Sequence, residues 1–219
     1  MNTNISKHIF IKILSIILFI TIIIGLLTRF SIHTYEFYNI YDDASNYIYY
    51  PFNDLEYANG YYKKIDSFEA LEQQSDYIIR GTVSRDRDVL EGCIKTVINC
   101  NSVLKGELSS ENISIYEPIN LDTSGAYLFI TFDGYNCLKE GNEYLFFLKE
   151  TDIPDEFMYV YPAFGKFPLD YSTQSFAIIP SKDKEIIYST YQNFEQVFQN
   201  QKELENYLEI RKIALELLK

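Results

Sequence analysis

Histidine is scarce in this chain of 219 residues, in which only His8 and His33 occur. Ser-His-Asp sites, Cys-His sites and typical zinc sites need histidine beside other reactive or metal-binding side chains. Both histidines flank a long apolar segment near the start of the chain, and we interpret His33 as a surface residue. The phosphate-binding patterns GxxxxGK[ST] and GxGxxG are missing too. We therefore expect no catalytic residue, no metal site and no cofactor.

Acidic residues are absent from the first 27 positions, yet the chain carries 31 Asp and Glu against 19 Lys and Arg, a net charge of −12. Phosphate binding requires a clustered basic surface, so this composition argues against nucleic acid as a partner. The acid-free part contains the apolar run 9–27, whose one charge is Lys12. A helix of this length reaches across a bilayer core. The sequence thus predicts a transmembrane anchor at 9–27, with the lipid bilayer as its partner.

A cleavable signal peptide is the alternative for this run, but no A-x-A-like pair of small residues follows Gly25. Lys7 and Lys12 lie at the start of the run, whereas Arg29 follows it and is soon outnumbered by acids. Basic residues beside a spanning helix are retained in the cytoplasm. We therefore expect a single-pass protein of the cell membrane, with a cytoplasmic tail at 1–8 and its main domain outside the cytoplasm.

Cysteine is rare as well, with three residues in the chain. Cys93 and Cys100 fall in one predicted strand, where they are too far apart to form a bond. A disulfide would have to involve Cys137, with Cys100 as its candidate partner. We favour the other interpretation, three buried thiols that act as small hydrophobic side chains.

Tyrosine is abundant just after the apolar run. Nine tyrosines lie within 35–62, among Asn, Asp, Pro51 and Gly60. We interpret 28–62 as a Tyr-rich stalk or irregular cover, since tyrosine is stable at a wet boundary without a ligand. An aromatic platform for a sugar or a peptide is the alternative.

The region 63–190 reads as short strands separated by turn residues. We expect a helix at 67–75, started by the capping pair Asp66 and Glu69, and a charged turn at 85–88. The predicted strands are 77–84, 93–104, 112–118, 126–132, 143–150, 157–162, 175–179 and 185–190. Such spacing is typical of an antiparallel barrel or sandwich.

After the last predicted strand, apolar residues at spacings of three and four predict an amphipathic helix within 191–219, capped by Asn193 and Gln196. We expect this helix to pack on the barrel rather than on a partner helix.

The stretch from Asp66 to Lys149 resembles a broad group of uncharacterised secreted or membrane-anchored bacterial proteins. The matching segments are "YIIRGTVS", "TVINCNSVLKGE", "NISIYEP" and "GNEYLFFLK", together with "FGKFPLD" at 164–170. That group looks like an OB-type barrel distantly similar to netrin-like and tissue-inhibitor-of-metalloproteinase domains. The resemblance implies a mainly β fold with flanking helices: an OB-like antiparallel barrel between an N-terminal transmembrane helix and a C-terminal amphipathic helix. Metalloproteinase inhibitors use an N-terminal cysteine, and because Cys93 is the first here, their mechanism is not implied.

Two acidic segments are candidates for an aspartic-protease motif and for a calcium loop, and neither has the required pattern. Asp122-Thr123-Ser124-Gly125 differs from the D-T-G of aspartic proteases by one residue, and its residue types are ordinary turn formers. The segment Asp152 to Glu156 lacks the spacing of a calcium loop, so we interpret it as a solvated turn.

The combined prediction is a membrane-anchored, extracytoplasmic binding or regulatory module without catalytic activity, whose partner is an envelope protein or a glycan. The alternatives are a carboxylate-dependent hydrolase at the cell surface and a structural or immunity-type membrane protein. Loop tips on such scaffolds tend to carry function. The candidate binding residues lie in two loops and on the last helix: Arg85, Asp86, Arg87, Asp88, Asp122, Thr123, Leu204 and Leu208.

Overall fold

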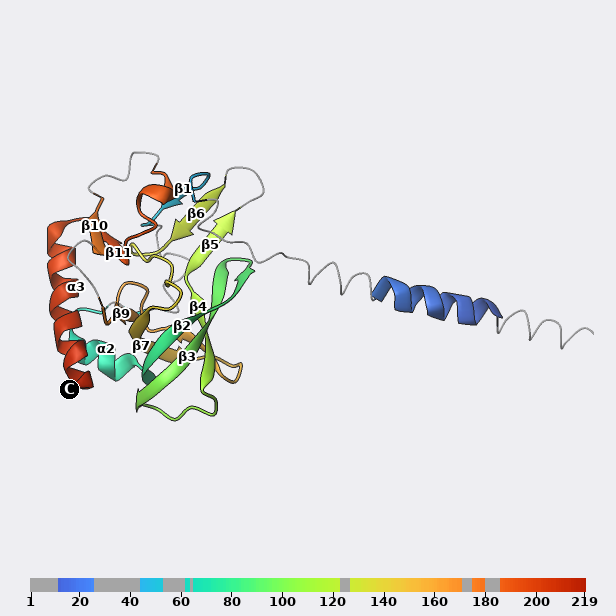
Figure 1. Ribbon diagram of the computed structural model, residues 1–219, viewed down its shortest axis with the longest axis horizontal. Helices are drawn as coiled ribbons and strands as arrows, with labels where there is room; N and C mark the ends of the chain where they lie inside the picture. Colours follow the sequence, from blue (N-terminus) through green and yellow to red (C-terminus); the bar gives the residue numbers. More distant parts are fainter. Residues whose placement is uncertain are drawn as a thin grey trace, which may run out of the picture. The chain divides into compact units, whose positions relative to one another are not determined.

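The computed structural model describes residues 12–25, 44–52, 62–63, 65–122, 127–170, 175–179 and 186–219. The chain divides into two compact units, Met1–Tyr38 and Asn39–Lys219. The first contains a helix over 12–25, whose large apolar side chains are exposed (Figure 1). Across the described residues, no helix is long and apolar enough to cross a membrane. The predicted span 9–27 continues past this helix at both ends, and its outer residues, the tail 1–8 and His33 lie outside the described residues.

A closed barrel of five strands forms the centre of the second unit. The strands are β2 (Tyr77–Leu90), β3 (Cys93–Lys105), β4 (Asn112–Glu117), β7 (Glu143–Glu150) and β8 (Glu156–Tyr159). Their order around the barrel is β2-β3-β4-β8-β7, and β7 pairs with β2 to close it. A short strand, β9 (Lys166–Pro168), adds to β7. The predicted mainly β barrel is thus confirmed.

The prediction that all pairs are antiparallel is wrong, because β4 and β8 run parallel. An odd number of strands cannot close into a ring if every neighbour reverses direction. With five strands, at least one pair must be parallel. Here it is the pair of β4 and β8, because β8 runs antiparallel to β7 and closes against β4.

The predicted turn at 85–88 is also wrong, since β2 runs through these residues to Leu90. Alternating charges are compatible with a strand where a partner pairs with them: Asp88 lies opposite Lys95 of β3, and their charged atoms are 3.8 Å apart. The reversal comes at Glu91 and Gly92, where Gly92 adopts a φ of 82° that glycine tolerates without strain.

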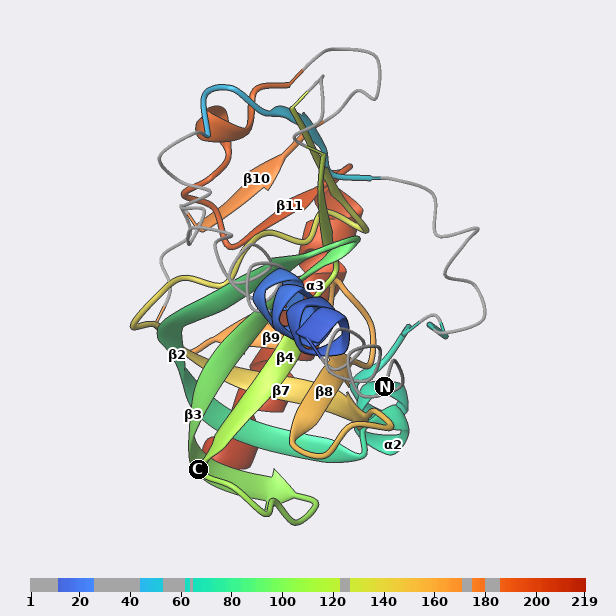
Figure 2. The same cartoon turned by 90° about the vertical axis from the view of Figure 1, so that its right-hand side faces the viewer.

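A second, smaller sheet lies beside the barrel, in the order β1-β6-β5. Its strands are β1 (Ile48–Tyr50), β6 (Leu128–Thr131) and β5 (Ile119–Asp122), and β1 runs parallel to β6. Tyr47 and Tyr49 are buried, so 44–52 belongs to the folded domain. The interpretation of these residues as a stalk is wrong and that of an irregular cover agrees with their burial, while 28–43 and 53–61 lie outside the described residues. Figure 2 shows β1 together with β10 (Phe176–Ile178) and β11 (Gln196–Phe198) above the barrel strands.

Two helices complete the domain. The helix α2 (Phe68–Gln74) begins at Ser67, whose hydroxyl accepts from the Ala70 amide, in place of the predicted cap at Asp66. The helix α3 (Gln201–Ala214) is capped by Asn200 and continues into the 3₁₀ turn η4 (Leu215–Leu218).

The predicted caps Asn193 and Gln196 of the last helix are wrong because β11 occupies 196–198, where it pairs with β10. The predicted strand 185–190 is replaced by the 3₁₀ turn η3 (Tyr188–Thr190).

Candidate functional site

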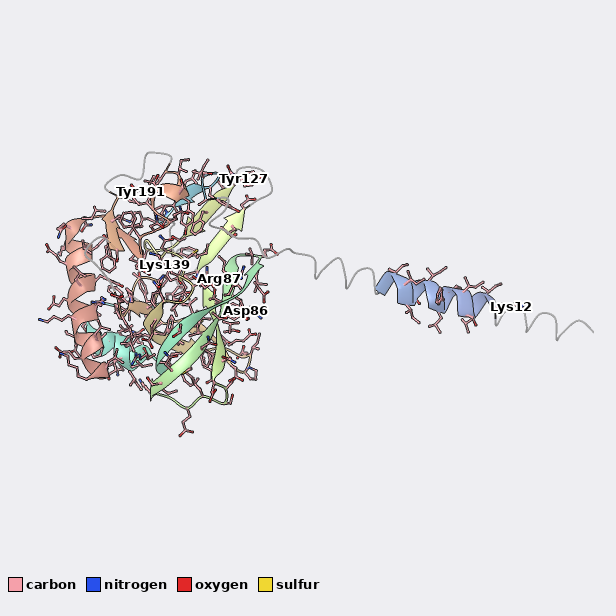
Figure 3. All side chains as sticks on the ribbon, in the orientation of Figure 1. Lys12, Asp86, Arg87, Tyr127, Lys139 and Tyr191 are labelled. Atoms are coloured by element: carbon pink, nitrogen blue, oxygen red, sulfur yellow. The ribbon has the colours of Figure 1, made fainter. Side chains whose placement is uncertain are left out.

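The candidate residues of β2 point to different sides of the strand. Arg85, Asp86 and Asp88 are exposed, whereas Arg87 is half-buried and its guanidinium donates to the Leu138 carbonyl. Figure 3 labels Asp86 and Arg87 on this strand. The four residues therefore form part of a barrel strand rather than a loop tip. One of them, Arg87, is hydrogen-bonded to the backbone of Leu138.

The other candidate residues do not join them. Asp122 ends β5, and Thr123 lies outside the described residues. Leu204 and Leu208 of α3 pack against the hydrophobic core of their own domain, as expected for a helix that lies on the barrel and contrary to an exposed contact surface. In Figure 1, α3 lies on the far side of the domain from the β2–β3 ribbon. The candidate residues therefore do not form one site.

The three cysteines are free thiols, so the candidate bond between Cys100 and Cys137 is absent, but of the three thiols only Cys137 is buried. Cys137 is fully buried, and burial beside Glu117 raises the pKa of its thiol to about 12. Cys100 is partly exposed on β3, where its sulfur lies 3.6 Å from the Ser102 carbonyl. The two thiols thus occupy different environments, one in the core and one on the barrel strand.

The most unusual chemistry of the domain is a buried cation. Lys166 on β9 is 2% exposed, and its ammonium donates to the Asn136 carbonyl. The same group lies 4.4 Å from the centre of the Tyr135 ring and 5.6 Å from that of Tyr144. Burial lowers the pKa of Lys166 to about 8, and the carboxylates of Glu195 and Glu117 oppose this effect. We call Lys166, Glu117, Glu195, Tyr135, Tyr144 and Asn136 the polar centre.

Glu117, the last residue of β4, is one of the two buried carboxylates of the polar centre. It accepts from the Tyr135 hydroxyl at 2.9 Å, from the Leu138 amide at 2.8 Å and from the Thr96 hydroxyl. The Tyr135 hydroxyl also lies 2.9 Å from that of Tyr159, and burial raises the pKa of both tyrosines. Three donors thus satisfy a carboxylate that would be costly to bury alone.

Glu195 is the second buried carboxylate, and it comes from the segment before β11. It accepts from the Tyr144 hydroxyl at 2.9 Å and pairs with the Lys139 ammonium at 3.2 Å. Figure 3 labels Lys139 in the middle of the domain. This carboxylate joins the C-terminal part of the chain to strand β7.

Asn136 connects the polar centre to the segment 188–194. Its amide group donates to the carbonyls of Tyr191 at 2.8 Å and Phe194 at 2.9 Å. Its side-chain oxygen accepts from the Tyr188 hydroxyl and from the Cys137 amide, each at 2.9 Å. The side chain therefore uses both donors and both acceptor sites of its amide group.

The polar centre holds distant parts of the chain together, and its charged side chains are buried. Lys166, Glu117 and Glu195 are at most 3% exposed. Two carboxylates can act on a glycosidic bond only where the substrate reaches both. Among the described residues, moreover, no three His, Cys, Asp or Glu side chains are grouped so that they could hold a metal ion. The arrangement is that of a satisfied hydrogen-bond network in the core.

The sequence analysis missed the polar centre, although the strand alternation contained a signal. Ile113 and Ile115 of β4 are buried, so the alternating pattern also points Glu117 inward. Lys166 stands between aromatic residues in "FGKFPLD", where a charge is unexpected. An isolated charge at an inward position is the pattern that indicates a buried partner.

Comparison with known proteins leaves the chain without an identified family: no protein-family model matches it, and no curated protein does. The fold itself defines the class as a mainly β domain, built on a closed five-stranded barrel and completed by a C-terminal helix.

Proposed function

We propose that this protein is a membrane-anchored binding module that displays an OB-type barrel outside the cytoplasm and contacts an envelope protein there. The observation that carries this proposal is the strand order. The first barrel strand pairs with the second and the fourth, and the third runs parallel to the fifth. OB-type barrels share this five-stranded Greek-key arrangement and act as binding scaffolds.

In OB-type barrels the ligand lies over the second and third strands and beside the turns that join strands one to two and four to five. Here these strands are β3 and β4, and the turns are 91–92 and 151–155. Each turn region presents an exposed apolar side chain, Leu90 at 40% and Ile153 at 51%. These two side chains add apolar area to the region where a ligand of such a barrel would lie.

The outer surface of β3 and β4 combines charges with an aromatic ring. The Lys95 ammonium lies 3.4 Å from Glu156 and 3.8 Å from Asp88, and Tyr116 donates to Glu156. Mixed polar and aromatic groups beside apolar ones are typical of non-obligate protein interfaces. Asp88, one of the candidate residues, belongs to this surface, which supports its place in a binding site.

A site-specific photocross-linker tests the proposal. A benzophenone amino acid replaces Asn99 on β3 of the full chain in the source cells, and the matched control replaces Glu209 on α3; both residues are exposed. The proposal predicts a discrete protein adduct from position 99 and none from position 209. Equal adducts at both positions contradict it, as does binding to purified cell-wall glycan without any protein adduct.

The anchored topology has its own test. The proposal predicts that an external protease removes a C-terminal tag from intact cells and leaves an N-terminal tag intact, because the tail 1–8 is cytoplasmic. Release of the whole chain into the medium contradicts the anchor.

A further inference from the structure

The outward side of the small sheet is apolar. In the pairing of β1 with β6, Ile48 lies opposite Leu128 and Tyr50 opposite Ile130. The alternate residues Tyr49 and Phe129 are buried, so the first four side chains point to the other face. Ile187 forms an antiparallel bridge with Ile48 and therefore shares that face. We call Ile48, Tyr50, Leu128, Ile130 and Ile187 the β1–β6 outer face.

This composition is unusual for the solvent side of a sheet, where polar residues normally alternate with buried ones. Tyr50 is 47% exposed and Ile187 is 40% exposed, while the other three residues are half-buried. Tyr127, which is 42% exposed and labelled in Figure 3, precedes β6, and its ring packs edge-on against the buried Tyr47. On β5, Asn120 and Asp122 form a polar rim. The face is therefore a bounded apolar patch.

A second copy of the chain fits this patch poorly. Stable interfaces bury about 800 Å² on each partner and involve roughly 20 to 30 residues a side. This face has five side chains, three of which are already half-buried. Charge attraction does not select a partner either, because the five residues carry no charge. The partner must be recognised by its apolar character.

The place of the patch in the chain indicates a lipid surface. Ile48 follows Leu27, the last residue of the apolar run, by 21 positions, and β1 is the first strand described after that run. Tyrosine, isoleucine and leucine suit the boundary between headgroups and acyl chains, where a ring with a hydroxyl has one wet and one apolar end. Binding of this kind depends on buried apolar area when basic residues are missing.

We propose that the β1–β6 outer face docks on the bilayer that holds the anchor, in the headgroup region. This inference rests on the proposed anchoring of residues 9–27. Docking orients the domain, because the small sheet then faces the lipid.

The chain contains no tryptophan, so a single introduced tryptophan reports on one position without background. The full-length Tyr50→Trp variant is reconstituted into phosphatidylcholine vesicles whose acyl chains are brominated near the headgroup. The matched control is Ile153→Trp, which lies on the β7–β8 turn and is 51% exposed in the parent chain. The expected result is at least twofold quenching of Tyr50→Trp by brominated lipid and no quenching of Ile153→Trp, with both proteins floating with the vesicles.

The outcomes separate the docking from the anchor. Flotation without quenching of Tyr50→Trp overturns the docking and leaves the anchor standing. Failure to float overturns the anchored function and, with it, the docking. A blue shift that depends on protein concentration without lipid means that a second copy covers the face, and this also overturns the proposal. Should Tyr50→Trp fail to fold by circular dichroism, Ile187→Trp replaces it with the same expectation.

Discussion

The Tyr135 ring lies between a buried cation and a buried anion: its centre is 4.4 Å from the Lys166 ammonium, and its hydroxyl donates to Glu117 at 2.9 Å. One face of the ring thus compensates positive charge while its edge compensates negative charge. Through Tyr135, the loop before β7 contacts both Lys166 of β9 and Glu117 of β4. The ring thus connects the ammonium and the carboxylate.

The buried lysine predicts a pH dependence of stability. Because burial lowers the pKa of Lys166 from 10.5 to about 8, the unfolded chain binds more protons than the folded chain between these values. Stability from this group therefore rises with pH above about 8. We expect the free energy of unfolding to gain about 1 kcal/mol from pH 7 to pH 9 relative to Lys166→Met, measured by urea unfolding of the full chain in detergent.

Lys212→Met, at an exposed position of α3, is the matched control and should follow the parent protein. The buried Cys137 acts in the opposite direction above pH 9, because its raised pKa keeps the folded thiol protonated, but it does so in every variant. Parallel pH profiles for the parent and Lys166→Met contradict the prediction.

Asn136→Ala should loosen the segment 188–194. The change removes four hydrogen bonds and leaves the partly buried carbonyls of Tyr191 and Phe194 without this donor. We expect a loss of about 3 kcal/mol and faster amide hydrogen exchange in this segment. Asn193→Ala, at an exposed position nearby, is the control. Unchanged exchange in Asn136→Ala would show that Asn136 does not hold the segment.

The thiols predict a labelling pattern. Under denaturing conditions without reductant, an alkylating reagent should modify all three cysteines. In the folded protein Cys137 should remain unmodified, because it is 1% exposed and its pKa is raised to about 12. Intact mass spectrometry counts the labels. A single label on the denatured chain means that a disulfide has formed, for which Cys100 and Cys137 are the candidate pair.

Leu208→Asp distinguishes a packed helix from a contact surface. Leu208 packs against the core of its own domain, so a carboxylate there should lower stability by about 2 kcal/mol. Glu209→Ala, on the exposed side of α3, should leave stability unchanged. If Leu208→Asp keeps the parent stability and loses the cross-linked partner, the leucine belongs to a binding surface after all.

Local sequence patterns predicted most barrel strands because apolar and polar residues alternate along them. The run 93–104 matches β3 closely, and 143–150 matches β7 at both ends. The same patterns failed at the three-residue strands β11 and β1. Phe194, Val197 and Phe198 have helical spacing, yet 196–198 pairs with β10, and Tyr49 and Tyr50 pair with β6. Such pairings depend on tertiary contacts that override local preference.

The candidate binding residues were chosen from the same local cues, and this explains their outcome. Arg85 to Asp88 look like a turn because all four are charged, but Arg87 and Asp88 pair with Thr96 and Lys95 of β3, and the pairing shifts register between Val83 and Arg87 while the strand continues. The polar centre was not predicted because Lys166, Glu117 and Glu195 are far apart in the chain and meet only in the fold. The sequence alone shows three ordinary charges.

The parallel pairing of β1 with β6 has a consequence for biosynthesis. Ile48 leaves the ribosome long before Leu128, its partner, and Ile187 arrives later still. The barrel strands β2 and β3 are neighbours in the chain and can pair as soon as they emerge. The strand synthesised first therefore waits for its neighbours, and the small sheet closes only when nearly the whole chain has been made.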